Sequence, residues 1–171
     1  MRWFLPYLRR GSASVLLSAG LVASAGCDRA RVFEENHDFK DYAWRAEEKP
    51  EFRFVITDTA ARYVVNFNVR TATDYPFYNL FVKLKLSDSA GHVVSHLRHE
   101  LNVRDPQTGR PLGDGLGDIF DQQVSALRGV RFAQAGTYHV EVEQNMRLSV
   151  LPQVMAVGVR IAREAPSAPA H

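Results

Sequence analysis

The side chain best suited to a covalent reaction is the only cysteine of the chain, Cys27. It directly follows Ser24-Ala25-Gly26, and three arginines and a weakly apolar run over residues 12–23 precede these small residues. This order is typical of a bacterial lipoprotein signal, in which the thiol receives diacylglycerol and the leader is removed. We therefore expect residues 1–26 to be a cleaved signal peptide and Cys27 to carry diacylglycerol and an N-acyl chain. The alternative is an ordinary secretory signal followed by a chance cysteine.

A single cysteine also limits the other chemistry that the chain can perform. It excludes an intramolecular disulfide and a zinc site built from cysteines. The apolar run before Cys27 is about a dozen residues long, which is shorter than the roughly 20 residues of a stable membrane span. Beyond the covalent lipid, we expect no cofactor.

A second candidate is the glycine-rich segment at residues 113–118. Glycine loops can cradle phosphates, and nearby carboxylates could hold calcium. The segment lacks the Lys-Ser/Thr pair of a phosphate loop, and its acids do not have the alternating spacing of a hand-type calcium loop. We therefore expect a structural turn with some glycines at positive φ, and no bound metal or nucleotide. The residues singled out are Gly113, Asp114, Gly115, Gly117 and Asp118.

A third candidate is the segment at residues 74–79, which gathers three aromatic rings around one proline. Proline fixes φ, and an aspartate at the start of a turn accepts its hydrogen bonds. The preferred interpretation is a rigid corner whose rings close one end of the fold. The alternative is an exposed platform on which Tyr75, Phe77 and Tyr78 contact a sugar or a protein. The residues singled out are Asp74, Tyr75, Pro76, Tyr78 and Asn79.

Neither the histidines nor any catalytic motif in the sequence indicates an enzyme. His92, His96 and His99 would converge on a helix, but the valines and leucines around them favour a strand, which separates them. We expect these histidines to lie on the surface and to bind no metal. No Gly-x-Ser-x-Gly or His-Glu-x-x-His motif occurs, and no pair of acids stands out for glycoside chemistry.

Strands must position all these residues, because apolar and polar side chains alternate along most of the chain. The alternating stretches are residues 51–57, 62–70, 80–87, 93–101, 138–144 and 157–161. A period of two buries one face of each strand, which is typical of antiparallel sheets. We predict an all-β fold, an antiparallel β-sandwich of the Ig-like or jelly-roll-like kind, as one domain over residues 27–162. The longest irregular loop is expected at residues 102–121, and a disordered tail at 163–171.

Composition is ordinary for a globular domain, with 46% hydrophobic and 23% charged residues, which excludes a disordered chain and a multi-span membrane protein. The formal charge of +2 includes three arginines of the predicted leader, so the rest of the chain carries −1. A nearly neutral body does not favour nucleic acid as a partner.

Four segments, in order along the chain, resemble a known family. They are Cys27-Asp28 with the nearby 31–35, the segment 74–81, the loop 112–119, and the run 130–147, which is followed by 157–161. In these segments the chain is similar to the gliding-motility lipoprotein GldH family of the Bacteroidetes, over essentially the whole mature chain. The resemblance implies a non-enzymatic, membrane-anchored component of the cell envelope that is required for gliding. Residues 74–79 and 113–118 look like its hallmarks, and it offers no catalytic residues to carry over.

Two functions follow as hypotheses. In the first, the lipid on Cys27 tethers a scaffold whose partners are other gliding-motility or secretion-system proteins of the envelope. In the second, the chain is a carbohydrate-binding envelope lipoprotein that uses the aromatic platform. The protein is expected to face the periplasm or the surface, and the inner and outer membranes both stay open as the site of the anchor.

Overall fold

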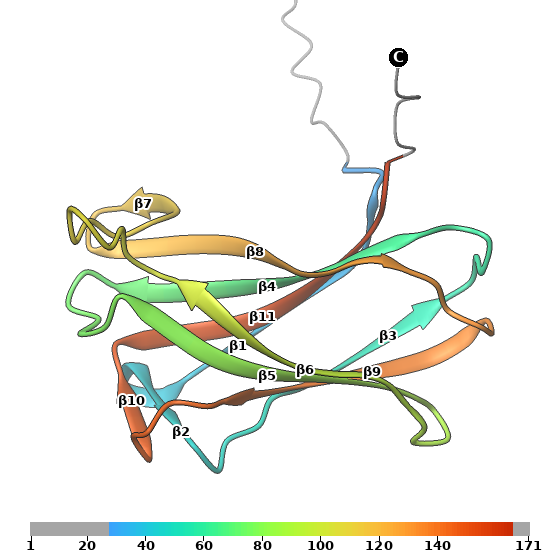
Figure 1. The fold of residues 1–171 in the computed structure, drawn as a ribbon, viewed down its shortest axis with the longest axis horizontal. Coiled ribbons are helices and arrows are strands. Elements are labelled where there is room, and N and C mark those ends of the chain that lie inside the picture. The colour runs from blue at the N-terminus through green and yellow to red at the C-terminus, as the bar shows by residue number, and fades with distance from the viewer. Residues whose placement is uncertain (1–27, 166–171) are drawn as a thin grey trace, which may run out of the picture.

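Nearly all regular structure in residues 28–165, which the computed structural model describes, consists of β-strands (Figure 1). The only helical element in that range is a short 3₁₀ turn, η1 (Lys40–Tyr42). The strands are β1 (Arg31–Asp38), β2 (Ala43–Arg45), β3 (Glu51–Ile56), β4 (Tyr63–Ala72), β5 (Asn79–Asp88), β6 (Val93–Asn102), β7 (Asp114–Leu116), β8 (Ile119–Val130), β9 (Gly136–Gln144), β10 (Val150–Pro152) and β11 (Val154–Arg163). The predicted signal peptide, Cys27 and residues 166–171 of the predicted tail lie outside the described residues.

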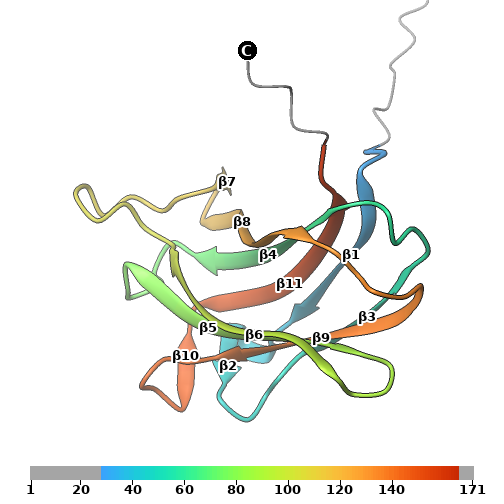
Figure 2. The same cartoon turned by 45° about the vertical axis from the view of Figure 1, so that its right-hand side comes forward.

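Two main sheets face each other, as the two views show (Figures 1 and 2). The larger has the strand order β1-β11-β4-β8-β7, and the smaller has the order β3-β9-β5-β6. Strands β2 and β10 form a separate two-stranded ribbon. Every pairing between named strands is antiparallel. The prediction of an all-β, antiparallel fold is therefore confirmed, and its two sheets pack as a sandwich.

The hydrophobic core lies between the two sheets and follows from the alternation in the sequence. In β3, Phe52, Phe54 and Ile56 are buried while the residues between them are exposed. Strand β5 buries every second side chain from Leu80 to Leu86 in the same way. Each large apolar side chain removed from water contributes about 1.5–3 kcal/mol, so the alternation determines which face of each strand turns inward.

Two boundaries differ from the prediction. The loop expected at residues 102–121 contains β7 and the start of β8, and Arg104 forms an isolated bridge with Pro111. The domain was expected to end at residue 162, but β11 continues through Arg163, and the backbone N–H of Glu164 donates to the Arg62 carbonyl at 2.8 Å. Two residues assigned to the tail are thus tied to the sheet by backbone hydrogen bonds.

The larger sheet has two ends, which are separated by the length of β4. At the proximal end, Arg31 at the start of β1 lies opposite Ala162, and the start of β4 at Tyr63 lies between Arg163 and Val130. At the distal end, β4 finishes beside the start of β8. Ten strand residues at about 3.3 Å each place these ends roughly 30 Å apart.

Candidate functional site at the distal end

The two loop segments singled out in the sequence meet at the distal end. Ala72 pairs with Ile119, which brings the end of β4 beside the start of β8. Just beyond that pair, the backbone N–H of Thr73 donates to the Asp118 carbonyl at 2.8 Å. Two segments 45 residues apart in the chain therefore form one surface. We call residues 73–79 the corner, residues 113–118 the glycine hairpin, and the two together the distal site.

The glycine hairpin is a tight two-strand turn. Strand β7 pairs with the first residues of β8, and Gly113 and Gly117 have φ of 98° and 62°, which side chains rarely adopt. A Cβ atom on Gly113 would lie 2.3 Å from the carbonyl oxygen of Asp121, so larger residues are excluded there. The geometry holds Leu116 out into solvent, with 84% of its surface exposed. Asp114 and Asp118 on either side of it are exposed as well.

The corner is built around one buried phenol. Tyr75 is only 2% exposed, and its hydroxyl donates to the Asn79 carbonyl at 2.9 Å, which closes the turn. Burial raises the pKa of the Tyr75 hydroxyl. Phe77 packs edge-on against Tyr75 with ring centroids 5.8 Å apart and is half-buried. Only Tyr78 is well exposed, at 56%, so the three-ring platform considered from the sequence does not exist.

Arg104 joins the corner to the turn that contains Gly109, and no sequence motif indicated it. Its guanidinium donates to the carbonyls of Thr73, Tyr75 and Gly109, the last two at 3.0 and 2.8 Å. The turn that contains Gly109 is held in addition by Asp105, whose carboxylate accepts backbone hydrogen bonds that lower its pKa. One charged side chain thus holds the corner and this turn together, and we call these contacts the Arg104 clamp.

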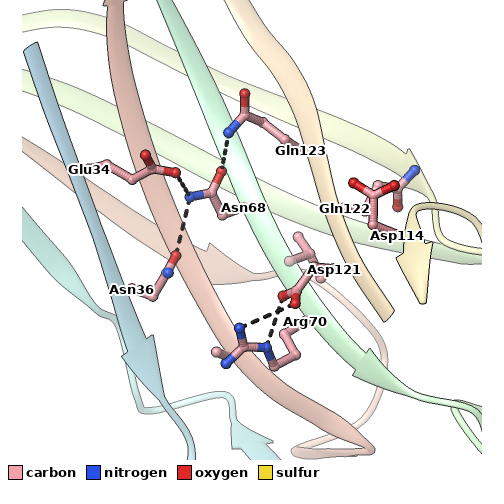
Figure 3. Close-up of a pocket in the computed structure, with 10 residues that line it drawn as sticks. Glu34, Asn36, Asn68, Arg70, Asp114, Asp121, Gln122 and Gln123 are labelled. Carbon is pink, nitrogen blue, oxygen red and sulfur yellow. Dashed lines mark hydrogen bonds and ion pairs between the residues drawn. The ribbon is translucent and has the colours of Figure 1, made fainter. Parts of the chain in front are cut away.

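An open hollow of about 300 Å³ lies beside the hairpin on the outer face of the larger sheet (Figure 3). Its polar lining consists of Glu34, Asn36, Asn68, Arg70, Asp114, Asp121, Gln122 and Gln123. Figure 3 shows that these side chains come from β1, β4, β7 and β8. The hollow therefore spans the sheet from one edge to the other and reaches the hairpin at Asp114.

Asn68 is the centre of the hydrogen bonds in this hollow. Its amide nitrogen donates to Glu34 Oε1 at 2.9 Å and to Asn36 Oδ1 at 3.2 Å, and its oxygen accepts from Gln123 at 2.9 Å (Figure 3). These bonds pass over β11 at Gly158, which lies between Asn36 and Asn68 in the register. A Cβ atom on Gly158 would lie 1.8 Å from Asn36 Oδ1, so only glycine permits the crossing.

A pair of opposite charges, Arg70 and Asp121, lines the hollow near the hairpin. Arg70 donates to both carboxylate oxygens of Asp121, at 2.8 and 3.2 Å. This paired geometry raises the pKa of Arg70 and is the stronger form of ion pair. Six of the hollow's eight polar side chains thus bind one another, and this lining of amides and paired charges is suited to recognising a polar surface.

The described residues bring together no group of three histidine, cysteine or acidic side chains that could hold a metal. The histidines on and before β6 separate as the strand assignment predicted. His92 and His96 are exposed. His99, expected on the surface, instead turns inward against Phe67 with ring centroids 5.5 Å apart, and burial lowers its pKa.

A short connection joins the predicted lipid site, Cys27, to the first strand. Three residues, Asp28 to Ala30, separate Cys27 from β1. Arg160 donates a hydrogen bond to the Asp28 carboxylate and so lowers its pKa. Between residues 28 and 165, none of the elements is a helix with the length and apolar character needed to cross a bilayer.

Comparison with known proteins shows what this chain is similar to. The sequence model described as GldH lipoprotein matches residues 31–161. The "Gliding motility lipoprotein GldH" of Flavobacterium johnsoniae is 29% identical over 163 residues, which cover 91% of this chain and 98% of the relative. The "Gliding motility lipoprotein GldH homolog" of Christiangramia forsetii is 27% identical over 150 residues, covering 84% of this chain and 90% of the relative. The match spans both loops of the distal site.

Proposed function

Since this chain belongs to the GldH lipoprotein family, we propose that it is a lipid-anchored envelope protein that acts in gliding motility as a scaffold without catalytic chemistry. The family match supports the lipid anchor and the link to motility. The scaffold role is supported by the distal site, where rigid turns display side chains to solvent, and by the neighbouring hollow, most of whose polar groups bind one another.

The scaffold role rests mainly on Leu116, which is exposed to solvent at the tip of the glycine hairpin. Strand pairing and two glycines hold this exposed leucine rigidly, so little conformational entropy is lost when a partner covers it. Tyr78 adds an exposed aromatic ring at the same end, and aromatic residues are enriched at protein interfaces. Asp114 and Asp118 flank the leucine, which favours a partner that offers an apolar pocket with basic residues around it.

The short connection to Cys27 sets where that partner must be. Three residues at about 3.5 Å each reach only about 10 Å, so the lipid holds the domain close to the bilayer. The distal site then stands at most roughly 30 Å farther along the sheet. Partners that are themselves in or on the same membrane are therefore favoured.

Photo-crosslinking in gliding cells tests the scaffold role. A photoreactive residue replaces Leu116, and the control replaces Val55, an aliphatic residue of β3 that is 54% exposed. We expect discrete crosslinks to envelope proteins from position 116 only, and lost motility for Leu116→Ser but not for Val55→Ser. Equal crosslinking at both positions, or normal motility of Leu116→Ser, contradicts the proposal.

The anchor is tested separately by Cys27→Ser. We expect this variant to move from the membrane fraction to the soluble fraction of the envelope and to abolish gliding. Intact-mass analysis of the purified native protein should show a chain that begins at Cys27 with acyl groups attached. An unmodified thiol or an intact leader in that spectrum refutes the anchor whatever the motility result.

The carbohydrate-binding alternative retains one supporting observation, the amide-rich hollow on the larger sheet, which reaches the same distal end where Tyr78 exposes its ring. Asparagine, glutamine and paired carboxylates are suitable partners for sugar hydroxyls. A glycan array with the wild-type protein and with Tyr78→Ala and Asn68→Ala decides between the functions. Binding that both variants lose supports the alternative, and no binding by a folded protein removes it.

A further inference from the structure

The proximal end, where the chain continues to Cys27, is rich in arginine. Six exposed arginines belong to segments that the strand register brings to this end: Arg29, Arg31, Arg62, Arg128, Arg131 and Arg163. The start of β1 and the end of β11 run side by side here in both views (Figures 1 and 2). The acids near these arginines are Asp28, Glu34, Asp58 and Glu164. Basic charge therefore exceeds acidic charge at this end.

Three of these acids are already in ion pairs, and one of them, Glu34, lies 3.4 Å from Arg31. Asp28 pairs with Arg160, and Asp58 lies 4.0 Å from Arg163. By contrast, Arg62, Arg128 and Arg131 form no ion pair within residues 28–165. The side chains of these three arginines are free to bind an anion from outside the domain.

The distal end has the opposite character. Its loops and strand ends carry Asp74, Asp105, Asp114, Asp118 and Asp121, most of them exposed. Of the cations there, Arg70 pairs with Asp121 and Arg104 donates to backbone carbonyls. Arg110 is exposed and forms no ion pair with any described residue, but the acids remain in excess. A domain whose net charge is close to zero is thus polarised along its length.

We propose that the proximal arginines bind the phosphate groups of anionic phospholipids in the membrane that holds the lipid anchor. This inference rests on the proposed function, because the acylated Cys27 would bring the proximal end to within about 10 Å of the bilayer. A lipid chain combined with a basic patch is a common two-part membrane attachment. Contact at the proximal end alone orients the domain, because the distal site lies roughly 30 Å along the sheet and so points away from the membrane.

The contact has a measurable strength. Each arginine near an anionic surface favours the bound state by about fivefold, so Arg62, Arg128 and Arg131 together favour the docked orientation by about a hundredfold. The attraction falls off within one Debye length, about 8 Å at physiological salt. About 1 M salt should therefore release the proximal end while the acyl chains stay inserted.

The experiment uses the native lipoprotein, purified with its lipid and reconstituted into vesicles. Because the diacylglycerol on sulfur blocks the Cys27 thiol, Ala133→Cys, in an exposed proximal loop, provides the only free thiol for a fluorescent probe. Thr108→Cys provides a distal probe in the same way. Quenching by neutral acrylamide is compared in phosphatidylcholine vesicles and in vesicles that also contain phosphatidylglycerol.

We expect phosphatidylglycerol to protect the probe at position 133 severalfold and to leave the probe at 108 accessible. The triple variant Arg62→Gln, Arg128→Gln, Arg131→Gln should remove this protection. A matched control, Lys40→Gln, Lys85→Gln, Arg147→Gln, removes three exposed cations elsewhere and should keep it. Equal quenching in both lipids, or protection that survives the proximal triple variant, overturns the proposal.

Failure of the anchor has a different signature from failure of the arginine contact. A protein without the anchor stays in solution when it is mixed with phosphatidylcholine vesicles, which refutes the anchor of the proposed function. The arginine contact is then judged with the phosphatidylglycerol vesicles alone. Protection of position 133 that depends on the three arginines still supports it, and absence of that protection still overturns it.

Discussion

Replacing Arg104 by alanine should loosen the distal site and lower the stability of the whole domain. The guanidinium makes three hydrogen bonds to backbone carbonyls of two segments that no other side chain joins in the described residues. A hydrogen bond to a charged group contributes about 1.5–3 kcal/mol net. Arg104 is half-exposed, so water replaces part of what is lost, and we take the total at about 3 kcal/mol.

For a domain of this size, 3 kcal/mol corresponds to a fall in Tm of about 10 °C. Thermal unfolding followed by circular dichroism measures this shift directly. Arg110→Ala is the matched control, because Arg110 is exposed on the same turn and its side chain makes no hydrogen bond within the described residues. Arg104→Lys should recover only part of the loss, since an ammonium cannot span three carbonyls. A Tm within about 1 °C of the Arg110→Ala value would refute the clamp.

Three further substitutions test other parts of the structure. Gly158→Ala should lower the free energy of unfolding in denaturant by about 3 kcal/mol, because the new Cβ meets Asn36 and the adjacent backbone. Adding Asn36→Ala should recover only part of this loss. Full stability of Gly158→Ala would contradict the register of β1 and β11. Burial lowers the pKa of His99, so the unfolded chain binds the proton more readily, and stability should fall as pH drops below about 6.5. His99→Leu should flatten that pH dependence, and an unchanged profile counts against the buried ring. Tyr75→Phe removes the hydroxyl that donates to the Asn79 carbonyl and should cost about 1 kcal/mol by thermal unfolding; a cost no larger than that of Tyr78→Phe argues against that bond.

Strands with regular alternation could be predicted from the sequence because their signal is local. The stretch 51–57 corresponds to β3 at Glu51–Ile56, and the stretch 80–87 corresponds to β5 at Asn79–Asp88. In both strands one face is buried against the opposite sheet, so every second residue must be apolar. The all-β assignment followed from these strands.

Strand β8 could not be recognised in the same way. Its inward positions include Gln122, whose side-chain nitrogen donates to the carbonyl of Asn102 at 2.9 Å, so a polar residue stands where a core residue was expected. Irregular pairing with β4 near Leu127 shifts the side chains within the strand. Most of its residues are only half-buried, so no clear period of two arises.

The distal site was identified in parts but not as a whole. Residues 74–79 and 113–118 stood out by composition, yet nothing local indicates that Thr73 contacts Asp118. Arg104 belongs to no motif, because an arginine acquires its role here only from carbonyls that the fold brings together. The exposed aromatic platform was a wrong alternative for the same reason, since the burial of Tyr75 depends on the packing around it.

By itself the sequence determined the features that depend on neighbours along the chain: the cysteine after small residues, the alternation of strands and the turn residues between them. Tertiary structure alone decided which loops share a surface, which carboxylates are paired, and that arginines and aspartates gather at opposite ends of a nearly neutral domain. The physical reason is that strand register links residues far apart in the chain, and a single residue of slippage would exchange the two faces of a strand.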